Sequence, residues 1–281
     1  MYLVTGASGQ TGARVVDQLV GAGEQVRALT RDPARLADLP HGVDRVVGDL
    51  DDMASLVTAM HGVDRLFLMN QGTSVTQIDN AVRAASAAGV SYIAYLSSMS
   101  TCLRHLRSGG KVFLEREKLL ENSGIATAFL RPGLFASNTL SWAESIRQTD
   151  LVEEAGGDGM FAPIDPQDIG DVAAVVLRDP GHAGQRYVLT GDKLMTAAEQ
   201  VGVLADVLGR RLRYRALPDE VALARLRAKG ATEDMLSFMA ELFDLIRTGV
   251  TAVRTSTVGD LIGRQPRTYR QWAQEHAGDF Q

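Results

Sequence analysis

The residues best placed to do chemistry form a glycine-rich stretch near the N-terminus. Gly6, Gly9 and Gly12 have the spacing of loops that hold the diphosphate of a dinucleotide. The first glycine permits a tight strand-to-helix turn, the second lets the backbone approach the diphosphate, and the third lets the helix sit close to the strand. The diphosphate would rest on free N–H groups at the helix N-terminus. The expected binding residues are Gly6, Ala7, Ser8, Gly9, Gln10, Thr11 and Gly12.

The end of the second predicted strand decides which dinucleotide is preferred. An NAD site places an acid there to accept from the ribose 2′-hydroxyl, whereas this chain has Thr30-Arg31-Asp32-Pro33. Arg31 can bind a 2′-phosphate through its guanidinium fork. Asp32 is the competing feature, because its carboxylate could serve the 2′-hydroxyl. The arrangement favours NADP(H) as the cofactor.

Hydride transfer to a carbonyl creates an alkoxide, so a reductase usually supplies an acid and hydrogen-bond donors at that oxygen. Ser98 and Ser100 follow the fifth predicted strand, and we expect them to position the substrate or its oxygen. His105 comes shortly after and is the one histidine of five placed to donate a proton, although a solvent-exposed position is the simpler interpretation.

The elements that must position these residues alternate in the first half of the chain. Short β-rich runs are separated by longer helical patterns, which is typical of a parallel sheet with crossover helices. The first helix carries Val15, Val16 and Leu19 on one face, and further helices are expected over 79–88 and 111–122. The predicted strands are Tyr2–Val4, Gln25–Leu29, Arg45–Val47, Arg65–Met69, Tyr92–Leu96 and Ala126–Leu130.

We expect an α/β fold: a Rossmann-type doubly wound parallel sheet with a smaller, mostly helical lobe or lid that binds substrate. Residues 1–150 would form the NADP(H)-binding core. Residues 151–281 would return to the core and form the lid, over about 192–250. Past Arg131 the pattern becomes irregular, so we expect elements there that cover the ligand edge of the sheet rather than extend it.

Three helices are expected in the lid. Thr196 and Glu199 make a capping box for the first, and the others are expected over 219–229 and 232–247. The broad apolar surface of the last either packs against the neighbouring helix or also walls an apolar substrate pocket. The residues expected to contact substrate are Met99, Phe135, Asn138, Trp142, Phe238 and Met239.

Composition excludes several functions. With 29 basic and 34 acidic residues the net charge is −5, which gives no electrostatic reason to expect nucleic acid. No apolar run approaches the roughly 20 residues needed to cross a bilayer, and no leader pattern is visible, so we expect a cytoplasmic protein without a membrane partner. The single cysteine, Cys102, excludes an internal disulfide and any multi-cysteine metal site, and no metal is expected.

The chain resembles the atypical short-chain dehydrogenases of the NmrA-like type along nearly its whole length. The motifs that carry the resemblance are Val4 to Gly12, Leu29 to Pro33, Gly48 to Asp52, Ser123 to Ile125, Leu130 to Gly133, Asp168 to Val172, Leu189 to Gly191 and Gly263 to Tyr269. The resemblance implies that Asp49 and Leu50 contact the adenine and that Asn70 flanks the ribose. It also implies that Pro132 to Phe135 lie beside the nicotinamide.

The chain departs from the wider short-chain family at the catalytic centre. The family tyrosine would fall near Gly109 and the lysine near Phe113, and Met99 stands where the family serine would be. Lys111, two residues from the lysine position, either reaches the ribose or is a solvated residue.

Three functions stay open from the sequence. The preferred one is an NADPH-dependent ketoreductase of a large aromatic, angucyclinone-like polyketide, with the proton taken from substrate or water. Tailoring ketoreductases of actinomycete antibiotic pathways, of the simocyclinone type, are similar in lacking the tyrosine. The alternatives are an NADP(H)-binding redox sensor without turnover and a reductase of quinones or enones. The expected partner is a small aromatic molecule; the oligomeric state stays open.

Overall fold

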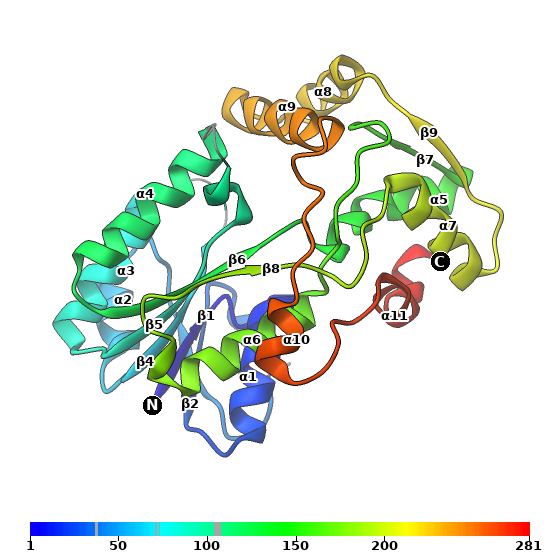
Figure 1. Ribbon diagram of the computed structural model, residues 1–281. Coiled ribbons are helices and arrows are strands. Elements are labelled where there is room, and N and C mark those ends of the chain that lie inside the picture. The colour runs from blue at the N-terminus through cyan, green and yellow to red at the C-terminus, as the bar shows by residue number, and fades with distance from the viewer. Residues whose placement is uncertain (37–38, 71, 73, 104–107) are drawn as a thin grey trace.

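Parallel strands form the centre of the molecule. A computed structural model describes residues 1–36, 39–70, 72, 74–103 and 108–281. Within these ranges one sheet of seven strands has the order β3-β2-β1-β4-β5-β6-β8, and every neighbouring pair is parallel (Figure 1). Its strands are β1 (Tyr2–Thr5), β2 (Val26–Thr30), β3 (Asp44–Val47), β4 (Arg65–Leu68), β5 (Tyr92–Leu96), β6 (Ala126–Pro132) and β8 (Arg186–Leu189).

Helices cover both faces of this sheet because its strands are apolar on both sides. In β1, Val4 packs with the helices of one face, whereas Leu3 packs with those of the other. The first face carries α1 (Gln10–Gly21), α6 (Pro166–Arg178) and α10 (Thr257–Ile262). The second carries α2 (Met53–Met60), α3 (Val75–Ala88) and α4 (Ser108–Asn122). The predicted doubly wound α/β fold is confirmed.

The second half of the chain corrects one expectation. We expected elements past Arg131 that cover the sheet without extending it, but β8 pairs with β6 as a seventh strand. The neighbouring α6 is a buried helix of the core, begun by an Asp165 cap that accepts from the N–H of Gln167. Asp-Pro at a helix start was a readable signal. The Thr196 and Glu199 capping box is confirmed, with both reciprocal hydrogen bonds present.

A smaller region stands beyond the carboxyl ends of the strands (Figure 1). It contains a two-stranded parallel sheet and a third apolar cluster. Its elements are β7 (Leu151–Glu154), β9 (Arg213–Ala216), α5 (Ala143–Thr149), α7 (Ala197–Leu208) and α11 (Tyr269–Glu275). The pair α8 (Asp219–Ala228) and α9 (Glu233–Arg247) follows, and α9 approaches the start of α4.

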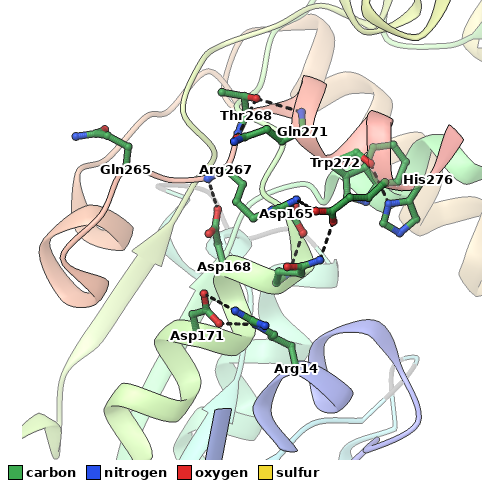
Figure 2. A network of polar contacts seen from close by, with 12 residues as sticks. Arg14, Asp165, Asp168, Asp171, Gln265, Arg267, Thr268, Gln271, Trp272 and His276 are labelled. Atoms are coloured by element: carbon green, nitrogen blue, oxygen red, sulfur yellow. Dashed lines mark hydrogen bonds and ion pairs between the residues drawn. The ribbon is translucent and has the colours of Figure 1, made fainter. Parts of the chain in front are cut away.

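A polar network holds the C-terminal segment to the core (Figure 2). Asp171 of α6 accepts from Arg14 of α1 at 2.6 Å and from Arg264 at 2.5 Å. The backbone N–H of Arg267 donates to the buried Asp168, and its guanidinium donates to Asp165, both at 2.7 Å. Two of the motifs that carried the family resemblance, Asp168 to Val172 and Gly263 to Tyr269, are therefore in contact. Through Arg14 they also hold α1, whose N-terminus faces the ligand edge of the sheet.

Candidate functional site

The glycine loop joins β1 to α1 with the close packing that its sequence requires. Gly6 has a φ of +63°, and a side chain on Gly12 would overlap the carbonyl oxygen of Gly6. At Gly9 a Cβ would lie 3.3 Å from the same oxygen. No side chain caps the start of α1, so its first N–H groups are not satisfied by a protein side chain. This is the cradle that a diphosphate requires.

A cavity of 640 Å³ opens over this loop and the ends of β1, β2 and β4. It lies in the crevice where the strand order reverses, between β1 and β4. Thr5 ties these strands together, accepting from the N–H of Met69 at 2.8 Å. The predicted residues in the wall of the cavity are Gly6, Ser8, Gly9, Arg31, Asp49, Leu50 and Asn70. Ala7, Thr11 and Gly12 lie buried behind the loop, and Gln10 is exposed outside the wall.

Two cations line the far end of this first cavity. Arg31 follows β2, and Arg35 follows one short turn later. Asp32 also lines the cavity; its Oδ1 accepts from the N–H of Ala34 at 3.0 Å, and its Oδ2 lies 3.8 Å from Nε of Arg35. Two guanidinium groups against one carboxylate leave these three residues with a net positive charge, as a 2′-phosphate requires. The sequence reasoning found Arg31 and missed Arg35.

Of the residues expected to contact adenine and ribose, Asp49 and Asn70 carry polar side chains, and each makes hydrogen bonds within the protein. Asp49 caps its own turn, since its Oδ1 accepts from the N–H of Asp51 at 3.0 Å. The amide nitrogen of Asn70 donates to the carbonyl of Ser74 and to Gln77, at 3.1 and 3.2 Å. Its Oδ1 is buried and has no donor within the described part of the chain. A ribose hydroxyl is the kind of donor that would satisfy it.

A second cavity, of 370 Å³, adjoins the first through two shared wall residues, Met69 and Asn70. Its wall comes from the ends of β5 and β6, the start of α4 and one face of α9. The predicted residues that line it are Ser98, Met99, Ser100, Pro132, Phe135, Asn138 and Phe238. The apolar face of α9 therefore contributes a wall to this cavity.

The serine run is held by its own hydrogen bonds. Ser98 Oγ accepts from the hydroxyl of Ser100 at 2.9 Å and from its backbone N–H at 3.2 Å. Ser97 is buried and donates to Glu117 at 2.5 Å, and Glu117 also pairs with Arg131. This buried group fixes the end of β5, while Ser98 and Ser100 face the cavity.

The places where the short-chain family has its tyrosine and lysine are apolar here. Gly109, Gly110 and Phe113 line the second cavity. Lys111 is exposed and lines neither cavity, because it lies on the side of α4 turned away from Gly110 and Phe113. Among the residues that the structure describes, no tyrosine or lysine lines the second cavity.

Two residues expected to contact substrate are absent from the wall of the second cavity. Trp142 is buried in the third apolar cluster, where its indole N–H donates to Glu154 at 2.7 Å. Met239 is half-buried on α9 but is absent from the cavity wall, which takes Phe238, Glu241, Leu242 and Leu245 from this helix. These four positions follow the spacing i, i+3, i+4 and i+7 of one helix face, and Met239 lies to one side of that face. His105 lies outside the described residues.

Several wall residues were not anticipated. Phe113 and Leu242 follow from the helical period once the cavity-facing side of each helix is known. Glu241 is the only titratable side chain among the described wall residues of the second cavity. No group of His, Cys, Asp or Glu in the described ranges is arranged to hold a metal ion. No described helix is long and apolar enough to cross a membrane.

The doubly wound sheet, the glycine loop and the crevice at the strand reversal define a dinucleotide-binding protein of the Rossmann class. The NmrA-like family model matches residues 2–270, and the chain belongs to this family.

Relatives match over their full length. The chain is 38% identical to a (4-alkanoyl-5-oxo-2,5-dihydrofuran-3-yl)methyl phosphate reductase of Streptomyces griseus, covering 100% of this chain and 99% of the relative. It is 32% identical to an NAD(P)H azoreductase of Xenophilus azovorans, again covering 100% and 99%. An NADPH-dependent quinone oxidoreductase of Escherichia coli, solved in complex with NADPH, superposes with a TM-score of 0.86 at 29% identity, covering 98% and 99%.

Proposed function

We propose that the protein reduces compact, flat, conjugated acceptors such as quinones with NADPH. The observation that carries this proposal is the junction of two cavities. A dinucleotide cavity with a positively charged end shares Met69 and Asn70 with a smaller apolar cavity walled by aromatic rings. A planar acceptor bound in the second cavity would lie beside whatever part of the dinucleotide reaches the junction.

The protein is an oxidoreductase, and its cofactor is NADP(H). The structure fits this cofactor at three points: the uncapped start of α1, the free Oδ1 of Asn70, and the pair Arg31 and Arg35. When bound, NADPH supplies a hydride. The protein's part is to hold the dinucleotide, to exclude water and to orient the acceptor.

The apolar catalytic centre favours a conjugated acceptor over an isolated ketone. Reducing a ketone concentrates negative charge on one oxygen, which needs a placed acid. The positions that would carry the family acid hold Gly109 and Phe113. Relatives are named for an oxo-dihydrofuran, an azo compound and quinones, all of which can spread charge over a conjugated system. Full-length relatives named as reductases favour turnover over a redox sensor.

The cavity volume favours a compact substrate. At 370 Å³ it stands near the lower end of the range of about 300–1,000 Å³ for small-molecule sites. A bicyclic quinone fits that size better than the angucyclinone-like polyketide expected from the sequence. The polyketide ketone, and with it a role in antibiotic biosynthesis, stays a prediction.

A panel of acceptors tests the proposal. Steady-state oxidation of NADPH is measured with menadione, an azo dye, an anthraquinone-like polyketide ketone and a simple aryl ketone. We expect menadione to have the highest kcat/KM and the simple ketone to be inert. Preferred reduction of the polyketide ketone would instead support the ketoreductase interpretation, and inert quinones would refute the proposal.

A further inference from the structure

Among the described residues that line the second cavity, Glu241 is the one acid, and all the others are neutral. Glu241 lies on α9, on the same face as Phe238, Leu242 and Leu245. No lysine, arginine or histidine is found among the described residues of this wall. An isolated carboxyl in an apolar wall costs free energy unless a partner satisfies it.

One of the two side-chain oxygens of Glu241 has a hydrogen-bond donor in the protein. The backbone N–H of Gly109, in the first turn of α4, donates to Glu241 Oε2 at 3.3 Å. This contact uses one of the backbone N–H groups that the start of a helix leaves without an intrahelical partner. The other oxygen, Oε1, is buried and has no hydrogen-bond partner among the residues that the structure describes. A carboxyl oxygen of a residue in the cavity wall is therefore left without a donor from this part of the chain.

We propose that Glu241 selects the substrate: it accepts a hydrogen bond from a hydroxyl or amine N–H carried by the conjugated acceptor. This inference rests on the proposed function. It narrows the substrate class to uncharged or cationic acceptors with a donor group, and it disfavours anionic ones. The phosphate ester named for the Streptomyces griseus relative would meet a like charge at this wall.

The neighbouring aromatic residues give the rest of the recognition. Phe113, Phe135 and Phe238 come from three different segments and line the same cavity. They offer ring surface to a planar acceptor, and they make a hydrogen bond to Glu241 stronger by excluding water. The substrate that accepts the hydride is then held in two ways. Its ring packs on the phenylalanines, and its hydroxyl or amine group donates a hydrogen bond to Glu241 on α9.

Three naphthoquinones of similar size test this inference: menadione, its 2-hydroxymethyl analogue and naphthoquinone-2-sulfonate. In that order, the first is neutral and has no hydrogen-bond donor, the second is neutral and has a donor, and the third is an anion. Each is measured as kcat/KM with NADPH and as Kd with NADP⁺ present, where no turnover occurs. The variants are Glu241→Gln and, as a matched control on the exposed side of α9, Glu233→Gln.

The wild-type protein and Glu233→Gln are expected to prefer the hydroxymethyl compound over menadione by about tenfold, the size of a hydrogen bond to a charged group. Glu241→Gln is expected to reduce this preference to less than about threefold and to improve binding of the sulfonate about tenfold. Unchanged preferences in Glu241→Gln, or a wild-type preference for the sulfonate, would overturn the inference.

The two proposals fail in different ways. If no quinone oxidises NADPH, the proposed function fails, but the Kd values still show whether Glu241 selects the donor-bearing ligand. If quinones are reduced while Glu241→Gln leaves the Kd ratios unchanged, the function stands and the role of Glu241 fails.

Discussion

The ring of Phe238 on α9 lies against Gly109 at the start of α4, so close that a Cβ on Gly109 would be 2.7 Å from Phe238 Cε2. The position where the resemblance to the short-chain family places a tyrosine is thus occupied by the ring of Phe238 from α9. The absence of a side chain at Gly109 is what lets α9 pack this closely.

Gly109→Ala tests that packing. The added methyl group displaces Phe238 and opens the second cavity, so KM for menadione should rise by about three- to tenfold. The Kd for NADPH should stay unchanged, because Gly109 does not line the first cavity. Gly202→Ala, at a helical glycine with open space around it, is the matched control. An unchanged KM in Gly109→Ala would mean that Phe238 does not shape the substrate site.

The positive end of the first cavity predicts a preference between nicotinamides. Arg31→Ala and Arg35→Ala should each weaken NADPH binding about tenfold and leave NADH nearly unaffected, because only NADPH carries the 2′-phosphate. Calorimetry with both dinucleotides measures this. Arg83→Ala, an exposed arginine on α3, is the control for a general charge effect. Equal losses for the two dinucleotides would refute the assignment of the 2′-phosphate to these arginines.

Two substitutions in the glycine loop are expected to have different effects, one on stability and one on NADPH binding. Gly12→Ala places a methyl group into the carbonyl of Gly6, so it should lower the free energy of unfolding by about 1–3 kcal/mol. Gly9→Ala has more room and should fold nearly normally, but its methyl group stands where the diphosphate approaches. Denaturant unfolding and NADPH titration separate the two effects. Normal NADPH binding by Gly9→Ala would show that the diphosphate does not bind at this loop.

The network around Asp171 predicts a loss of stability distant from the site. Asp171→Ala leaves Arg14 and Arg264 without their shared carboxylate and should cost about 1–3 kcal/mol, with KM for quinone unchanged. Arg270→Ala breaks an exposed pair with Asp206 and should cost under about 1 kcal/mol. Equal costs would mean that the Asp171 network does not fix the C-terminal segment.

Local signals in the sequence were enough for the dinucleotide half of the site. The turn at Gly6 and the helix start that follows are encoded within one short stretch, and six strands were readable from β-rich runs. The helix α6 was missed because the pattern past Arg131 is irregular, and β8 was missed because a short edge strand gives a weak pattern.

The substrate half depends on tertiary packing, which periodicity alone does not give. Trp142 was expected at the substrate because of its aromatic ring, yet it is buried in the third apolar cluster and its indole N–H donates to Glu154. Glu241 was not anticipated, because only the approach of α9 to Gly109 brings it to the cavity wall. In the dinucleotide cavity, Arg35 was missed because the short turn after β2 that brings it there was not predicted.

If one site joins bound NADPH to a quinone, a single turnover should show it. The protein loaded with a stoichiometric amount of NADPH is mixed without oxygen with excess menadione, and the nicotinamide absorbance is followed. We expect complete loss of that absorbance in one fast phase, slowed in Gly109→Ala. Tight NADPH binding with no oxidation by any conjugated acceptor would refute the proposed function.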